Sequence, residues 1–192
     1  LTQQWFSQVE SSGGGTFLDN GCHVFDILRW FMGEMAECVG MTDTALWKIE
    51  PLEDNAVGVF RNHRGKLALV HSSWTEWAGY FYMEVYGTEG FLRIDCRKNA
   101  CTLTVGTTKG EMTVQDFSAL PPSSYQDEVR AFVTSLREGR QPSPSGFDGL
   151  RAVQMAHGVY DAGRRGTKAS LWTEEDRALA ERVQAAERRA RP

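Results

Sequence analysis

Hydrophobic and polar positions change their period twice along the chain, and the two changes divide it into three parts. Over residues 17–32 apolar side chains recur on nearly every side of a helix, and Gly33 follows where a C-terminal cap is expected. This pattern predicts a helix buried in the core. Residues 1–12 are largely polar, with Trp5 and Phe6 embedded among them, and we expect an arm or a short helix there.

From about Ala36 to Phe117 the period is that of strands. Seven strands are predicted, over residues 38–47, 55–61, 66–74, 81–86, 90–94, 101–105 and 111–115. Their short connections require antiparallel neighbours, because a parallel return needs a dozen or more residues. Along the third strand Leu67 and Leu69 alternate with Ala68 and Val70, so both faces of the sheet are partly apolar.

Helical periodicity returns after Pro121-Pro122. Helices are predicted over residues 125–139 and 147–166, and from Glu174 to about Arg189 behind a Thr173–Asp176 capping box. One helix, a run of strands and further helices indicate the α+β class, in a single domain over residues 1–192. We expect a largely antiparallel open sheet with helices on one face and with the other face available for oligomerisation.

Composition and charge remove several classes of function. The chain has 192 residues, of which 41% are hydrophobic, and this is enough apolar material for a packed core. Its 25 acidic and 21 basic residues give a net charge of −4, so there is no basic surface for nucleic acid. No apolar run approaches the roughly 18–20 residues that a membrane helix needs. We therefore expect partners that are neither nucleic acid nor membrane.

Four cysteines, Cys22, Cys38, Cys96 and Cys101, show neither the spacing of a zinc site nor that of a disulfide framework. Cys96 and Cys101 could face each other across a hairpin, but simple packing is the favoured interpretation. The sequence thus predicts reduced thiols and a cytoplasmic protein.

The strongest candidate for chemistry is the pair Asp19 and His23. They are four residues apart, so on a helix they share one face, and a carboxylate beside an imidazole suits proton transfer. The alternative is a buried histidine bonded to Asp19, with Gly21 present for close packing. A metal site formed by Asp19, His23 and another histidine is a further alternative. It is not favoured, and the sequence predicts no bound metal.

The stretch from Gly13 to Gly33 contains a triple glycine, then Asp-x-Gly-x-His-x-x-Asp, then Arg-Trp. It resembles the second domain of the Gfo/Idh/MocA oxidoreductases. Further segments match this family in the same order: Glu53-Asp54-Asn55-Ala56, Ser73-Trp74, Tyr86-Gly87-Thr88-Glu89-Gly90, Tyr125-x-x-Glu128-x-x-x-Phe132 and Gly139-x-x-Pro142. The resemblance covers about residues 12–171.

This resemblance implies a two-domain enzyme in which an N-terminal Rossmann domain binds NAD or NADP and a C-terminal α+β domain supplies the substrate site and the oligomer interface. The chain lacks the Rossmann fingerprint, since Leu18 stands where the last glycine should be, and it lacks the family's Glu-Lys-Pro motif. Residues 1–12 are then an arm from the preceding domain and residues 173–192 the C-terminal helix. We expect no cofactor bound to this chain alone, and no turnover by it.

The resemblance also implies roles for individual residues. Asp19 orients His23, and His23 acts as the general acid/base at the substrate hydroxyl while hydride passes between the nicotinamide and the carbinol carbon. The candidates for binding a sugar or polyol ring are Trp74, Glu76, Trp77, Tyr82 and Tyr125. Alternatively, Trp74 and Tyr82 belong to the core or an interface, and Tyr125 anchors its helix.

The expected function is therefore the substrate-binding and oligomerisation domain of an NAD(P)-dependent oxidoreductase acting on a sugar, polyol or related hydroxy compound. We expect a homodimer or homotetramer through the open sheet face. Two alternatives stay open: a non-catalytic oligomerisation or ligand-binding module, and an NAD-using glycosidase of the same family.

Overall fold

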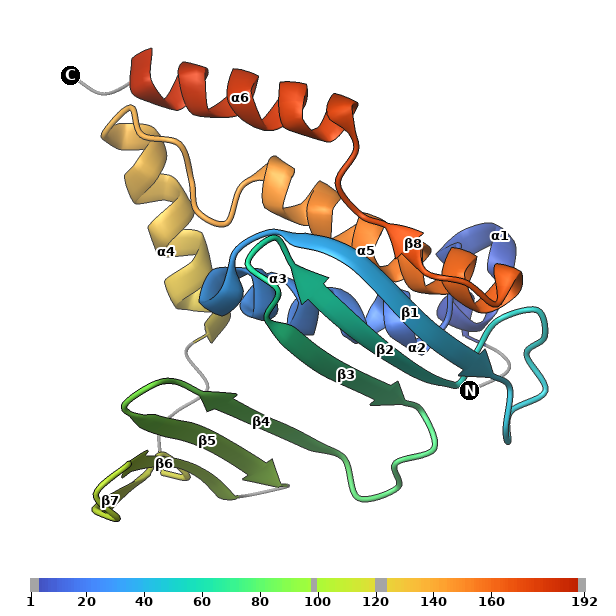
Figure 1. The fold of residues 1–192 in the computed structure, drawn as a ribbon, viewed down its shortest axis with the longest axis horizontal. Helices are drawn as coiled ribbons and strands as arrows, with labels where there is room; N and C mark the ends of the chain where they lie inside the picture. The colour runs from blue at the N-terminus through green and yellow to red at the C-terminus, as the bar shows by residue number, and fades with distance from the viewer. Residues whose placement is uncertain (1–3, 98–99, 120–123, 190–192) are drawn as a thin grey trace. The chain divides into compact units, whose positions relative to one another are not determined.

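The computed structural model describes residues 4–97, 100–119 and 124–189. It divides the chain into two compact units, one built from Leu1–Thr75 with Val129–Pro192 and the other from Glu76–Glu128. Each unit contains its own four-stranded sheet, and every pair of neighbouring strands is antiparallel (Figure 1).

The first unit begins with short helical segments that lead into one longer helix. These are the 3-10 helix η1 (Trp5–Ser7) and the helices α1 (Val9–Ser12), α2 (Thr16–Asp19) and α3 (Gly21–Met32). The sheet has the strand order β3-β2-β1-β8, formed by β1 (Met35–Asp43), β2 (Asn55–Asn62), β3 (Leu67–Ser73) and β8 (Ala169–Ser170). The remaining helices are α4 (Ser124–Arg137), which begins in the other unit, α5 (Gly146–Arg165) and α6 (Glu174–Arg189).

Helices α2, α3 and α5 cover one face of the first sheet (Figure 1). Alternate residues of β2 point into this layer, and the ring of Phe60 packs edge-on against Phe25, which packs edge-on against Phe17. Gly40 lets α5 approach closely, because a Cβ there would lie 2.6 Å from a methyl of Val159. The core is formed by fully or almost fully buried side chains: Phe17, Phe25, Met35, Cys38, Phe60, Val70, Met155 and Val159.

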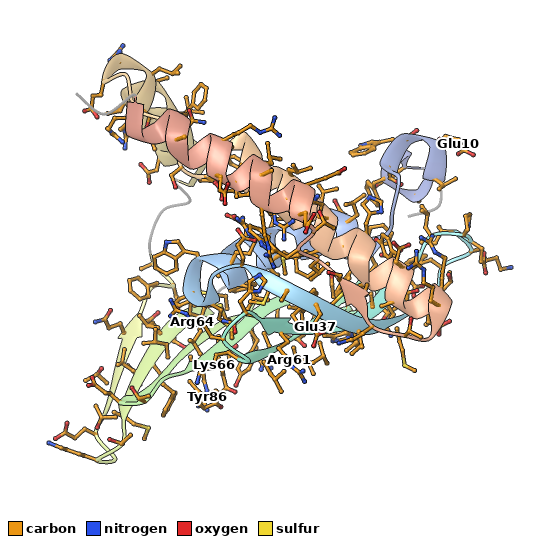
Figure 2. The ribbon with its side chains drawn as sticks, turned by 45° about the horizontal axis from the view of Figure 1, so that its top comes forward. Glu10, Glu37, Arg61, Arg64, Lys66 and Tyr86 are labelled. Carbon is orange, nitrogen blue, oxygen red and sulfur yellow. A yellow bond between two sulfur atoms is a disulfide. The ribbon has the colours of Figure 1, made fainter. Side chains whose placement is uncertain are left out.

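The opposite face of this sheet, which we call the open face, is covered by none of the described helices of the first unit (Figure 1). It carries five exposed large apolar side chains, Val39, Met41, Val57, Leu67 and Leu69. On β1, Glu37 forms an ion pair with Arg61 of β2 at 3.1 Å (Figure 2). It forms a second ion pair with Lys168 at 2.6 Å. The alternation predicted for the third strand is confirmed, since Val70 is buried while Leu67 and Leu69 are exposed.

The second unit is a meander with the strand order β4-β5-β6-β7. Its strands are β4 (Tyr80–Tyr86), β5 (Gly90–Arg97), β6 (Ala100–Thr107) and β7 (Met112–Asp116). Cys96 and Cys101 are directly opposed on β5 and β6 and form a disulfide. The expectation of four reduced thiols is therefore wrong for this pair, because the hairpin register brings the two side chains together. Cys22 and Cys38 are free.

The predicted α+β class and antiparallel pairing are confirmed, but the strands form two sheets where one was expected. The segment between β3 and β4 is occupied by turns: Ser73 Oγ accepts the Thr75 amide, and the Gly79 amide bonds the Glu76 carbonyl. The two-residue strand β8 is too short to give a periodic signal, and the sequence did not predict it. None of the helices in the described parts of the chain has the length and apolar character to cross a membrane.

Candidate functional site

Asp19 and His23 lie on either side of a junction between two helices. Asp19 is the last residue of α2, His23 lies in the first turn of α3, and Asn20 between them keeps right-handed helical angles (φ −89°, ψ −35°). Both side chains are exposed, and within the described chain no hydrogen bond joins them. The alternative of a buried, satisfied histidine is therefore wrong, while the catalytic role of the pair stays a prediction.

The residue that holds this helical segment in place is Glu53, in the loop before β2. Its carboxylate accepts the amides of Gly15 (3.0 Å, Oε2) and Phe17 (2.9 Å, Oε1), and its own carbonyl accepts the amide of Thr16 (3.0 Å). The first amides of a helix have no partner within the helix, and an anion is favourable there. Glu53, which is buried, thus satisfies three consecutive amides at the start of α2.

Tyr160 of α5 completes this arrangement. Its hydroxyl donates a hydrogen bond of 2.7 Å to Oε1 of Glu53. Burial and the neighbouring carboxylate raise the pKa of Tyr160, so the hydroxyl remains a donor. The glycines of the turn leave the necessary room: a Cβ on Gly14 would lie 2.8 Å from the Tyr160 hydroxyl, and one on Gly15 only 1.9 Å from the Glu53 carbonyl.

The next residue, Asp54, binds a second backbone segment in the same way. Its buried carboxylate accepts the amides of Ala45, Leu46 and Trp47, each at 2.8 Å. Burial raises the pKa of this carboxyl, and the three hydrogen bonds more than offset the effect, so the pKa lies below its ordinary value. These bonds also explain why β1 ends at Asp43 rather than at residue 47 as predicted.

Trp74, a predicted substrate-binding residue, is attached to the same loop. Its amide donates to the Asp54 carbonyl at 2.8 Å, and its carbonyl accepts the indole N–H of Trp47 at 3.2 Å. The half-buried Trp74 ring lies 5.5 Å from that of Phe6, centroid to centroid. Glu53 and Asp54 therefore connect the start of α2 with the backbone of Trp74.

The other predicted binding residues, Glu76, Trp77, Tyr82 and Tyr125, belong to the second unit. Trp77 is 77% exposed, Tyr125 is 82% exposed, and Glu76 is also exposed. On the face shared by β4 and β5, Glu84 accepts hydrogen bonds from Arg93 Nε at 2.7 Å and from the Tyr86 hydroxyl at 2.8 Å. A hydrogen bond to the same carboxylate raises the pKa of Tyr82. Their role in binding a substrate stays a prediction.

The glycine-rich turn at Gly13–Gly15 does not form a cradle for a dinucleotide. A phosphate would need the free amides at the start of the helix, and Glu53 already binds those of Gly15, Thr16 and Phe17. The residues of this turn therefore do not fit the pyrophosphate of NAD. Among the residues with defined placement, no group of three or more His, Cys, Asp or Glu side chains is arranged to hold a metal ion.

Sequence reasoning did not assign a role to Glu53 or Tyr160. Two adjacent acids before a strand give no sign that one of them is buried beneath a helix 36 residues away. The usable signal was the triple glycine, because three consecutive residues without side chains indicate that something packs closely against the turn. Asp26, three residues after His23, lies 3.5 Å from Arg29.

Comparison with known proteins places this chain in a family. A model described as the GFO/IDH/MocA C-terminal domain matches residues 1–93. The 1,5-anhydro-D-fructose reductase of Ensifer adhaerens is 29% identical over 175 residues, covering 89% of this chain and 52% of the relative. The myo-inositol 2-dehydrogenase of Thermotoga maritima is 31% identical over 152 residues, covering 75% of this chain and 45% of the relative.

The fold agrees with that of solved structures. A levoglucosan dehydrogenase in complex with NADH and levoglucosan superposes with a TM-score of 0.75 at 17% identity, over 87% of this chain and 53% of that protein. The chain spans about half the length of the curated relatives it matches. The match to the family model and the sequence identity with the two curated relatives show that the chain belongs to the family of GFO/IDH/MocA C-terminal domains.

Proposed function

We propose that this chain is the substrate-binding domain of an oxidoreductase that acts on a sugar, a polyol or a related hydroxy compound. The observation that carries the proposal is the exposed pair Asp19 and His23, presented by a helical segment whose first amides are fixed by Glu53. The names of the relatives support the class, since the reductase and the dehydrogenases act on a sugar derivative or a cyclic polyol.

In this proposal His23 is the general acid/base of the reaction. During oxidation it accepts the proton of the substrate hydroxyl, and Asp19 stabilises the resulting imidazolium and orients the ring. The hydride acceptor for the carbinol carbon would be NAD or NADP, which a Rossmann domain outside this chain would hold. Because neither the cofactor cradle nor the family's Glu-Lys-Pro lysine lies in these 192 residues, the chain alone does not turn over substrate.

The aromatic residues are the proposed walls of the substrate site. Trp74 presents an indole beside Phe6, and an apolar ring face suits the C–H face of a sugar. Glu76, Trp77, Tyr82 and Tyr125 are proposed to add hydrogen-bond acceptors and further ring faces.

The open face is the proposed oligomer interface. Met41 is 80% exposed and Leu69 is 68% exposed, and an apolar face of this kind marks an interaction site. A second copy of the chain, in a homodimer or homotetramer, covers it. We also propose that residues 1–192 form a single domain, with an arm at residues 1–12. A cytoplasmic location is a further part of the proposal; the free thiols of Cys22 and Cys38 support it, and the Cys96–Cys101 disulfide does not.

The test is an assay of the full-length protein with NAD+, NADP+ and their reduced forms against myo-inositol, 1,5-anhydro-D-fructose and levoglucosan. Reduction or oxidation of the cofactor, followed by absorbance, is the expected result. Release of p-nitrophenol from p-nitrophenyl glycosides that requires NAD+ would favour the glycosidase alternative. Ligand binding without turnover in any assay would favour the non-catalytic module and contradict the proposal.

A further inference from the structure

We propose that Glu53 and Tyr160 are positioning residues: together they form a clamp that fixes the α2–α3 segment so that Asp19 and His23 meet the substrate in a reactive geometry. The inference rests on the proposed function. Neither side chain is expected to touch the substrate. Both act through the backbone of the segment that carries the proton-transfer pair.

The clamp specifies a single position of the helix. Glu53 pairs with three consecutive amides, those of Gly15, Thr16 and Phe17, using two carboxylate oxygens and one carbonyl. A shift or rotation of α2 would break several of these bonds at once and leave a buried carboxylate unsatisfied, which is costly in an apolar environment. The helical path then continues through Asn20 to His23, so the position of the first turn is transmitted to the pair.

Tyr160 connects the clamp to the rigid core. Tyr160 follows Val159, whose side chain is fully buried and packs at Gly40 and Gly58 in the sheet. The Tyr160 hydroxyl donates to the same Glu53 oxygen that accepts the Phe17 amide. The start of α2 and helix α5 are therefore both hydrogen-bonded to one buried acceptor, Oε1 of Glu53 in the loop before β2.

The clamp is also connected to the proposed substrate wall. The carbonyl of Asp54, the residue after Glu53, accepts a hydrogen bond from the Trp74 amide. In addition, Thr16 Oγ1 lies 2.8 Å from Ser72 Oγ near the end of β3. One dipeptide thus fixes both the helix that presents His23 and the strand end that presents Trp74. A misplacement of about 1 Å between reacting groups can cost about 100-fold in rate, so such a connection bears on turnover.

The experiment compares variants of the full-length protein with its fastest substrate from the panel of myo-inositol, 1,5-anhydro-D-fructose and levoglucosan. Tyr160→Phe removes one donor and keeps the ring. Glu53→Gln places an amide donor opposite backbone donors. Asn62→Asp is the control, because Asn62 Nδ2 donates to the Met32 carbonyl at the opposite end of α3. Measured quantities are kcat, KM, the melting temperature and the isotope effect of deuterium at the carbinol carbon.

We expect Tyr160→Phe to lower kcat by about 10-fold and Glu53→Gln by about 100-fold, with KM within about twofold and an increased isotope effect. Asn62→Asp should lower the melting temperature as Tyr160→Phe does and leave kcat unchanged. If Glu53→Gln does not fold, Tyr160→Phe decides. A kcat for Tyr160→Phe within about twofold of the Asn62→Asp value, or an effect on KM alone, overturns the clamp.

His23→Ala in the same series separates this inference from the proposed function. If His23→Ala is inactive while Tyr160→Phe is fully active, only the clamp fails. If His23→Ala is fully active, or if no panel substrate is turned over, the proposed function fails and the clamp with it.

Discussion

The Tyr160 hydroxyl donates a hydrogen bond of 2.7 Å to Oε1 of Glu53, and the same oxygen accepts a hydrogen bond from the amide of Phe17. Three segments far apart in the sequence therefore converge on one buried acceptor. Gly14 and Gly15 make this possible, because side chains at either position would occupy the space of the Tyr160 hydroxyl or the Glu53 backbone.

Gly15→Ala should destabilise the protein strongly. The new Cβ would lie 1.9 Å from the Glu53 carbonyl oxygen, and this backbone atom cannot move aside without breaking its bond to Thr16. We expect a loss of about 3 kcal/mol in the free energy of unfolding, measured by urea denaturation. Gly149→Ala is the matched control: a Cβ there meets nothing within 4 Å, and alanine in a helix should add about 0.5 kcal/mol. Equal effects of the two substitutions would contradict the packing described for the turn.

Asp54→Asn should remove a pH-dependent part of the stability. The pKa of the Asp54 carboxyl is lowered from 3.8, since three amide bonds outweigh its burial. A lowered folded-state pKa means that the contribution is complete above the unfolded value and disappears as pH falls through the folded value. We expect Asp54→Asn to lower the free energy of unfolding by about 2 kcal/mol at pH 7. Below about pH 4 the difference in unfolding free energy between the variant and the natural protein should become smaller. A gap that stays constant down to about pH 2.5 would show that the Asp54 charge is not stabilising.

Arg151→Met should be among the most damaging changes outside the site. The Arg151 side chain is 1% exposed, pairs with Glu34 at 3.0 Å and Asp176 at 3.2 Å, and lies over the ring of Trp172. Without Arg151 the buried Asp176 has no cation, while Glu34 keeps its ion pair with Arg29. We expect a cost of about 3–5 kcal/mol, measured by thermal or urea unfolding. Arg164→Ala removes an exposed ion pair with Asp161 and should leave stability unchanged within error. A mild effect of Arg151→Met would mean that water reaches this network.

Leu69→Lys should dissociate the proposed oligomer. Leu69 lies on the open face, where a lysine would put a charge into the interface. Val114→Lys is the control, because Val114 is similarly exposed on a strand of the second sheet. Light scattering on the full-length variants should show smaller particles for Leu69→Lys alone. A natural protein that is monomeric, or a Leu69→Lys protein of unchanged mass, contradicts the proposed interface.

The sequence pattern predicted the class of the fold and most of its elements, because amphipathic periods are local. The capping box at Thr173 and Asp176 is present, with the Asp176 amide 3.2 Å from Thr173 Oγ1, and α6 begins at Glu174 as expected. The Cys96–Cys101 pairing and the division into two sheets were not predicted. Both depend on the course of the chain in space, and a period of two says nothing about which sheet a strand joins.

The candidate site could be predicted only in part for the same reason. Asp19 and His23 were found because they lie four residues apart on a helical pattern. Glu53 and Tyr160 come from a loop and a distant helix. Their hydrogen bond to each other, and that of Glu53 to Gly15, are tertiary contacts without a local signature. The buried carboxylate runs against the expectation that glutamate is exposed, and it is tolerated because each of its oxygens accepts a hydrogen bond.

The most direct test of the account is single-turnover cofactor reduction by the full-length protein carrying His23→Ala. If His23 is the general acid/base, the rate of the chemical step should fall by about 100- to 10,000-fold, while the melting temperature and the affinity for NAD+ or NADP+ stay at the values of the natural protein. A chemical step of unchanged rate in a folded, cofactor-binding variant would remove His23 from the reaction and contradict the proposed function.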